Sequence, residues 1–327
     1  MEMMIDFTEG FSHGHVIWGW MIGVYLVLAG MSGGALIVAL VRRHYSKNKE
    51  NTGLLKGAAI IGFGTIAFGM VFLVADLHRP LYFWKILINY NFTSVMSIGV
   101  AAISLYIPLT LMVFLMALEE EIKEFFQTKI KISFVHTMLT IVINILKRFR
   151  PYIEFITIFF AIVICAYTGF LISVLIRFPL LNTAVLPILF LVSGLAAGVA
   201  ATRLLTAGYY RVNPSTFDEG LLHRIEWPVM FLEILLIAML IVSLVLGNNY
   251  QKEAMAAFDV TRSQWAYLFW GGVVGVGFGV PLSLNFLFGH KVAHSSFTMY
   301  ASGISTLLGV LSLRLFLLYG GQTFGIH

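Results

Sequence analysis

Cysteine and charged residues are scarce in this sequence. Its 327 residues include one cysteine, Cys165, and 11% are charged, whereas 59% are hydrophobic. A single cysteine excludes a disulfide framework, and it excludes an iron–sulfur cluster held by this chain's own cysteines. Soluble domains carry about 25% charged residues, so most of this chain is predicted to lie in lipid.

Histidines are present but badly placed for a haem. None of the nine lies in the middle of a long apolar run. Membrane b-type haems need imidazoles that face each other inside the helices, so we predict no haem. The chain also lacks a Walker loop, a dinucleotide fingerprint and zinc-ligand spacing, and we predict no metal site. The net charge of +5 is attributed to lysines and arginines in the loops, which set the orientation of the protein in the membrane. No nucleic-acid partner is predicted.

Long apolar runs make up most of the sequence. A span takes about 20 apolar residues, and these runs are too long for barrel strands. We predict an all-α integral membrane protein with eight transmembrane helices, at residues 16–41, 54–76, 94–118, 152–176, 182–206, 228–247, 265–287 and 294–319. Pro187 and Pro281 fall inside the fifth and seventh runs and are expected to kink them.

The segment 119–151 carries charges at both ends and a short apolar middle at 130–146. This pattern predicts an amphipathic helix on the membrane surface. A ninth span is the alternative, and it would invert the topology of everything after it.

Basic residues are unevenly divided between the two sides of the predicted bundle. The first, third, fifth and seventh connections hold most of them, and the opposite connections hold Arg79, Lys85, Arg177, Lys252 and Arg262. Basic loops stay in the cytoplasm, so both termini are predicted to lie outside, on the same side as Asp76.

Two segments half a chain apart share a pattern of small residues. Aligning Tyr25–Leu40 with Leu189–Leu204 pairs Gly30 with Gly194 and Gly34 with Gly198. Each Gly-x-x-x-Gly surface lets helix backbones approach closely. The offset favours two parallel repeats, although two unrelated close-packing helices would look the same.

The repeat predicts two four-helix bundles. The first consists of residues 1–151, including the surface segment, and is completed by the helix at 152–176. The second consists of residues 177–327. Gly271, Gly272, Gly275, Gly277 and Gly279 lie inside an apolar span and are predicted to serve helix packing and not phosphate binding.

Asp76 is the strongest candidate for a functional residue. It ends the second apolar run and opens Asp76–Trp84, in which a carboxylate, an imidazole, a guanidinium, a proline and two belt-type aromatics follow closely. An ionisable side chain where a hydrophobic helix meets the membrane surface indicates function.

Further polar side chains are predicted to reach the outer side near Asp76: Tyr25, Tyr167, Arg314, His13, His15 and Arg79. Hydroxyl donors, a carboxylate acceptor and a cation could bind the two oxygens of a quinone and accept quinol protons. Each has an ordinary alternative. Tyrosines populate the interfacial belt, Arg314 could snorkel to the surface, and the histidines could simply be solvated.

A second polar group is predicted towards the cytoplasmic side. Arg203 and Glu233 lie inside the fifth and sixth spans, and the connection between them includes Asp218, Glu219 and Glu226. One interpretation is a proton pathway through Glu226, Glu233 and Arg203. The alternative is an Arg203–Glu233 pair that holds two helices together beneath a solvated loop.

Three segments together resemble the NrfD/PsrC family of polysulfide-reductase-type membrane subunits. They are Trp18 with Tyr25–Ala35, Asp76–Pro80 with Phe83 and Trp84, and Asn91–Ser97. The likeness is densest over residues 10–100, and the eight-span layout extends it along the chain. This chain has His78 where the family usually has glycine, and it has Ile98 where the family often has tryptophan. Neither departure removes a candidate site group.

The resemblance implies a subunit of the bacterial inner membrane that oxidises menaquinol. Its electrons would pass to a four-cluster iron–sulfur subunit and on to a molybdopterin catalytic subunit, as in a polysulfide or thiosulfate reductase. The family's quinol site lies near the outer face among the first four helices. Asp76 would take a quinol proton, and Tyr25 and Tyr167 would orient the ring.

Two other functions remain open at the level of sequence. A secondary transporter or proton channel with two parallel repeats would have a polar site at the bilayer midplane, served by Arg203, Glu233 and Pro281. A passive membrane anchor would use its acids only for topology.

Overall fold

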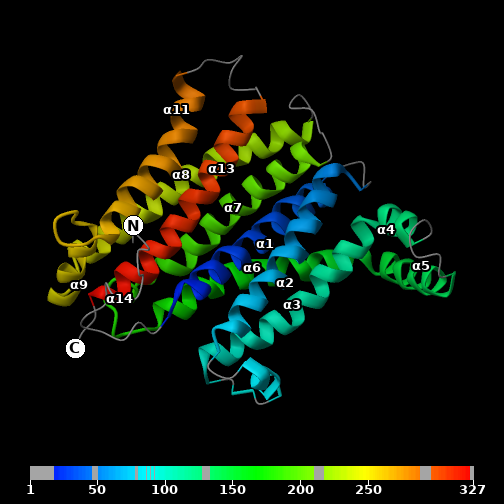
Figure 1. Ribbon diagram of the computed structural model, residues 1–327, viewed down its shortest axis with the longest axis horizontal. Helices are drawn as coiled ribbons and strands as arrows, with labels where there is room; N and C mark the ends of the chain where they lie inside the picture. Colours follow the sequence, from blue (N-terminus) through cyan, green and yellow to red (C-terminus); the bar gives the residue numbers. More distant parts are fainter. Residues whose placement is uncertain are drawn as a thin grey trace, which may run out of the picture.

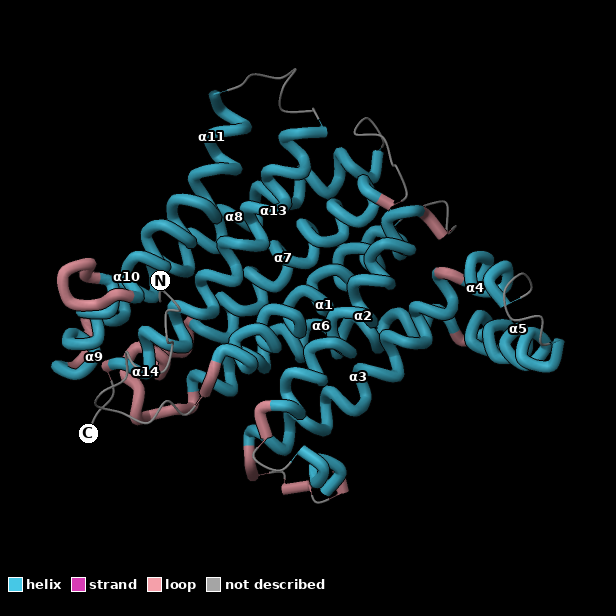
Figure 2. The backbone as a smooth tube through the Cα atoms, viewed as in Figure 1, coloured by secondary structure: helices cyan, strands magenta, loops and turns pink. Residues whose placement is uncertain are grey.

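The chain forms a bundle of long helices (Figures 1 and 2). The computed structural model describes residues 18–45, 51–77, 80–85, 87–88, 90–91, 93–126, 133–209, 217–287 and 296–324. Within these ranges the secondary structure is helical, without strands, and eight helices are long and apolar enough to cross a membrane. The predicted all-α class and the eight spans are confirmed.

The spanning helices follow the predicted order. They are α1 (Trp20–Tyr45), α2 (Gly53–Ala75), α3 (Val95–Ala117), α6 (Arg150–Ser173), α7 (Leu186–Gly208), α8 (Phe217–Val245), the run α10 (Trp265–Tyr267), η4 (Leu268–Gly279) and α11 (Val280–Leu287), and the run α13 (Ser296–Leu315), η5 (Phe316–Gly320) and α14 (Gly321–Thr323). Shorter helices connect them: η1 (Pro80–Lys85), α4 (Glu119–Phe125), α5 (Ser133–Arg148), α9 (Asn249–Ala254) and η3 (Met255–Phe258).

Helices α1 and α7 form the centre of the bundle, side by side in Figure 1. The small-residue surfaces explain the contact: a Cβ atom on Gly194 would lie 3.1 Å from the Gly30 carbonyl oxygen, and one on Gly198 would overlap the backbone of Gly34. The prediction of close backbone packing is confirmed for both glycine pairs, which pack against each other.

One continuous hydrophobic core connects the two predicted halves, from Tyr25 on α1 to Leu317 on η5. Outward-facing Phe68, Leu105 and Phe159 are more than half exposed, as lipid-facing side chains are in a membrane helix. The division into two bundles at residue 176 stays a prediction, as does the placement of both termini outside.

The connection after α3 projects sideways from the bundle as the hairpin α4–α5 (Figure 1). Helix α5 has 16 residues, about 24 Å at 1.5 Å per residue, which is too short for the hydrocarbon core. Its Met138, Ile141 and Ile145 side chains are exposed. These features agree with a surface helix and not with a ninth span.

Two prolines behave differently from each other. The predicted kink at Pro187 is wrong, because α7 begins at Leu186 and proline is tolerated in a first helical turn. Pro281 stands where the π-helix η4 changes into the α-helix α11. Packing explains two of the nearby glycines: a Cβ on Gly272 would meet Ser312, and one on Gly277 would lie 2.8 Å from Gly309 Cα.

We call the end of the bundle that contains Tyr45, Ala117 and Arg150 the basic end. There Arg43 of α1 donates to both oxygens of the buried Glu154 carboxylate, at 2.6 and 2.7 Å. Arg150 Nε also contacts Glu154, at 2.8 Å, and its Nη2 donates to Asn51 Oδ1. These bonds tie the starts of α2 and α6 to the end of α1.

Candidate functional site

Asp76 closes α2 at the end opposite the basic end. Its backbone N–H donates to the Phe72 carbonyl, and the N–H of Leu77 donates to the Val74 carbonyl. Asp76 is therefore the C-cap of α2, and it is half-buried. A Cβ on Gly19 would lie 3.8 Å from Asp76 Oδ1, and the carboxylate interacts electrostatically with Tyr319. Asp76 therefore faces a junction of three segments: the start of α1, the end of α2 and η5.

The two ends of the chain's membrane part are bound together beside this junction. Trp18 N donates to Gln322 Oε1 at 3.0 Å, and Gln322 Nε2 donates back to the Trp18 carbonyl at 3.1 Å. Tyr319 stacks on Trp265 with 4.7 Å between ring centroids. Together with Asp76, these polar and aromatic side chains form the rim of the bundle at this end.

Tyr25 and Tyr167 form a pair below this rim. Tyr25, 2% exposed, packs beside Gly69 of α2, and six residues of α1 place it about 9 Å deeper than Gly19. Tyr167 of α6 fills the space that a side chain on Gly99 would take, and its hydroxyl donates to the Met96 carbonyl at 3.4 Å. The phenols are close enough to interact electrostatically.

Arg314 lies away from these groups, at the crossing of α1, α7 and α13. It is 0% exposed, and its Nη2 donates to the Phe190 carbonyl at 3.0 Å and to Ser193 Oγ at 2.7 Å. The guanidinium carbon lies 3.4 Å from the centre of the Phe190 ring. Arg314 does not snorkel to the surface, because these partners hold it in the interior.

The second polar group is also buried, but with a different pairing from the one predicted. Arg203 Nη1 contacts Glu226 Oε2 at 2.8 Å, and Ser302 Oγ donates to Glu226 Oε1 at 3.1 Å. Glu233, two turns along α8 from Glu226, interacts electrostatically with Arg314. Arg203 thus pairs with Glu226, whereas Glu233 interacts with Arg314.

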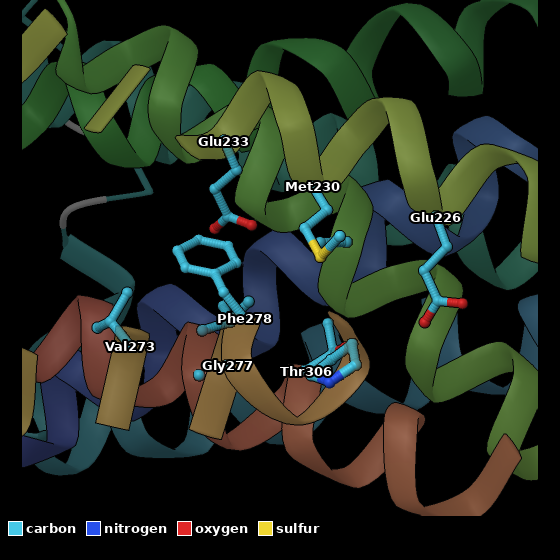
Figure 3. A pocket seen from close by; sticks show the side chains of 11 residues that line it. Glu226, Met230, Glu233, Val273, Gly277, Phe278 and Thr306 are labelled. Atoms are coloured by element: carbon cyan, nitrogen blue, oxygen red, sulfur yellow. The ribbon is translucent and has the colours of Figure 1, made fainter. Parts of the chain in front are cut away.

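A small, partly open cavity lies between Glu226 and Glu233 (Figure 3). Its other lining residues come from α7, α8, η4, α11 and α13: Ala196, Met230, Val273, Gly277, Phe278, Pro281, Thr306, Gly309 and Val310. The structure therefore joins Glu233 and Pro281, two of the three residues expected to serve a transporter-like site.

Several predicted residues lie outside the described part of the chain, namely His13, His15, His78 and Arg79. The side chains of Asp218, Glu219 and His223 are outside it as well. Among the described side chains, no group of three His, Cys, Asp or Glu residues is arranged to hold a metal ion.

Sequence reasoning missed several buried partners. Tyr319 and Gln322 join the Asp76 rim, and Ser193 binds Arg314. The Tyr106 hydroxyl lies 3.0 Å from Ser32 Oγ, which donates to the Gly62 carbonyl. Polar side chains inside apolar runs were the available signal, but only the fold shows which of them meet.

Comparison with known proteins identifies the family of this chain. The family described as "Polysulphide reductase, NrfD" matches residues 8–326, almost the whole chain. The chain belongs to the NrfD family. The predicted family is confirmed, and this NrfD-family chain, with its eight apolar helices, is a multi-pass integral membrane protein, consistent with a bacterial inner membrane.

Individual relatives of this NrfD-family protein match over most of their length. A polysulfide reductase chain of Wolinella succinogenes is 38% identical over 312 residues, which cover 94% of the present sequence and 95% of that protein. Protein NrfD of Escherichia coli is 35% identical over 96% of the present sequence and 98% of its own. A selenate reductase subunit of Mesobacillus selenatarsenatis is 24% identical over 91% and 72%.

Proposed function

We propose that this chain is the membrane subunit of a respiratory reductase and oxidises menaquinol near Asp76. Its electrons pass to a periplasmic four-cluster iron–sulfur subunit, which serves a molybdopterin catalytic subunit of the polysulfide or thiosulfate type. Relatives named as parts of polysulfide and selenate reductases support the assignment to a complex.

The observation that carries the proposal is the order in depth, from the rim into the bundle, of three side chains at one end of the molecule. Asp76 is half-buried at the rim, and the Tyr25–Tyr167 pair lies deeper among α1, α2, α3 and α6. Quinone rings are apolar with two polar oxygens, which suits a mostly apolar site with a few placed donors and acceptors.

Each residue has a distinct role in the proposed reaction. The tyrosine hydroxyls donate hydrogen bonds to the ring oxygens and orient the ring. Oxidation breaks two O–H bonds and releases two electrons and two protons. The electrons leave to the iron–sulfur partner, because this chain has one cysteine and cannot hold a cluster of its own. Asp76 accepts protons and passes them to water at the rim.

Asp76→Asn tests this function directly. In the purified complex, the variant is expected to abolish turnover driven by a menaquinol analogue and to leave reduction of the acceptor by an artificial dye intact. Asp259→Asn is the matched control, because Asp259 also lies in a connection at this end and is 43% exposed. Full quinol activity in Asp76→Asn would remove Asp76 from the mechanism.

Copurification separates an active subunit from a passive anchor. An iron–sulfur partner is expected to copurify with the chain, and quinone is expected in the extract of the wild-type complex. A complex that contains the partner but neither binds nor oxidises quinol would favour the passive anchor.

A further inference from the structure

The cavity between Glu226 and Glu233 lies in the predicted second half, on the far side of the α1–α7 contact from the tyrosine pair. Glu226 and Glu233 are seven residues apart, about 10 Å along α8, so the cavity extends along the helix axis. Figure 3 shows both carboxylates projecting from α8 towards the helices that carry Phe278 and Thr306.

Glu233 is the unusual group in this cavity. It is 5% exposed, and within the described part of the chain its carboxylate makes no hydrogen bond to protein. A buried carboxylate without hydrogen bonds is costly, and it is retained in membrane helices where it serves a function. Glu233 lines the cavity, and Figure 3 shows its carboxylate directed towards Phe278 on the opposite wall.

Arg314 contributes a complementary set of donors. Its Nη2 is satisfied by Phe190 and Ser193, but Nε and Nη1 are buried without a hydrogen-bond partner in the described structure. Arg314 and Glu233 interact electrostatically without a direct salt bridge. Water between them would satisfy both groups.

At the other end of the cavity, Glu226 leads towards the basic end. It is held by Arg203 and Ser302. From Glu226, α8 runs back to its first residue, Phe217, at the basic end. Each acid of α8 therefore has an arginine of opposite charge: Arg203 of α7 contacts Glu226, and Arg314 of α13 interacts electrostatically with Glu233. The charges of the two pairs balance.

We propose that Glu233 is a proton-binding residue that exchanges its proton with the basic end through water in this cavity and through Glu226, with Arg314 as its counter-ion. The proton forms an O–H bond on the Glu233 carboxylate and leaves by the same route, so the step requires no other reactant. This assignment does not depend on quinol oxidation at Asp76.

A metal cation is a poorer ligand for the cavity than a proton. Hard cations take about six to eight oxygen ligands. The lining residues offer the two carboxylates and the Thr306 hydroxyl as polar side chains, whereas Val273, Phe278 and Pro281 from η4 and α11 are apolar. A proton needs only the carboxylate itself and a chain of water.

Infrared difference spectroscopy of the intact complex in proteoliposomes tests the assignment. A titration with pH is expected to show one buried protonated-carboxyl band that is sensitive to deuterium exchange. Glu233→Gln should remove the band, and Glu253→Gln should retain it, because Glu253 is an exposed acid on α9. A band that survives in Glu233→Gln overturns the proposal, as does a titration set by Na⁺ and not by pH.

Two further variants separate site, route and folding. Glu226→Gln should keep the band but slow its hydrogen–deuterium exchange by about 100-fold, the lower end of what a positioned acid or base contributes. An unchanged exchange rate would remove Glu226 from the route. If Glu233→Gln does not assemble, Glu233→Asp should shift the band and not delete it; an unshifted band overturns the assignment.

Asp76→Asn completes the set by separating the two proposals. It is expected to stop quinol oxidation while the Glu233 band persists. Loss of the Glu233 band in Asp76→Asn would contradict the independence of the two sites, whereas failure of the quinol proposal would leave the Glu233 titration in place.

Discussion

Gly34 of α1 and Gly194 of α7 are in direct backbone contact. A Cβ atom on Gly34 would overlap the carbonyl group of Gly194, which belongs to the backbone and cannot rotate away. A close contact in the centre of the bundle therefore joins residues 160 positions apart in sequence, and it forms because neither of them has a side chain.

Gly34→Ala tests this contact. Overpacking of a close interface costs about 1–3 kcal/mol, so the variant should unfold at a lower temperature than the wild type in detergent. Gly64→Ala is the control, because a Cβ there meets nothing within 4 Å. Equal stability of the two variants would show that α1 and α7 can separate without cost.

Glu154→Gln tests the cluster at the basic end. The side chains of Arg43 and Glu154 are each 10% exposed, and Arg150 contacts the same carboxylate. Removal of the acid leaves two cations in a poorly solvated site, at an expected cost of about 3–5 kcal/mol. Chemical unfolding monitored by tryptophan fluorescence measures this cost, and a loss below about 0.5 kcal/mol would mean that water already screens the cluster.

Tyr167→Phe tests the role of the deeper tyrosine pair. The hydroxyl's protein hydrogen bond is long, at 3.4 Å, so its removal should hardly change stability. Loss of a hydrogen bond to the quinol ring should raise KM by about fivefold, equivalent to about 1 kcal/mol. Tyr106→Phe is the contrasting control, because its hydroxyl contacts Ser32 and the KM for quinol should not change.

The hairpin α4–α5 should respond to pH through Glu119. Partial burial raises the pKa of Glu119, but the Lys123 and Lys147 ammonium groups lower it more, and the net pKa falls below its usual 4.5. The carboxylate therefore stabilises the hairpin above pH 4.5, and this contribution is lost as the pH falls through the lowered value.

Spin labels on α4 and α5 measure this pH response. The distance distribution between them should broaden in acid for the wild type. In Glu119→Gln it should be broad and independent of pH. A hairpin that stays ordered in acid would show that apolar contacts alone position it.

The distribution of basic residues also predicts how the bundle is oriented in the membrane, with both termini outside. Alkaline phosphatase fused after His327 should be active, and green fluorescent protein fused there should be dark, if the terminus is periplasmic. The reverse pattern would place the Asp76 end in the cytoplasm and would require a cytoplasmic iron–sulfur partner.

Much of the fold followed from the sequence alone. Runs of apolar residues in a chain with few charges leave helices as the only economical solution in lipid, because each backbone group must be satisfied within its own segment. The same local reasoning found the small-residue faces of α1 and α7, Asp76 at a helix end and the amphipathic helix α5. The start of α7 at Leu186 was missed, because a proline can begin a helix as readily as bend one.

Only the tertiary structure decided which polar groups meet. Glu226 and not Glu233 contacts Arg203, and Arg314 is held by a carbonyl and a hydroxyl of α7 in the interior. Hydropathy describes each helix separately, whereas these contacts depend on the rotation and depth of one helix against another. Packing between helices, of which the Gly30–Gly194 crossing is one example, sets both, and a residue's own neighbours in sequence carry no record of that geometry.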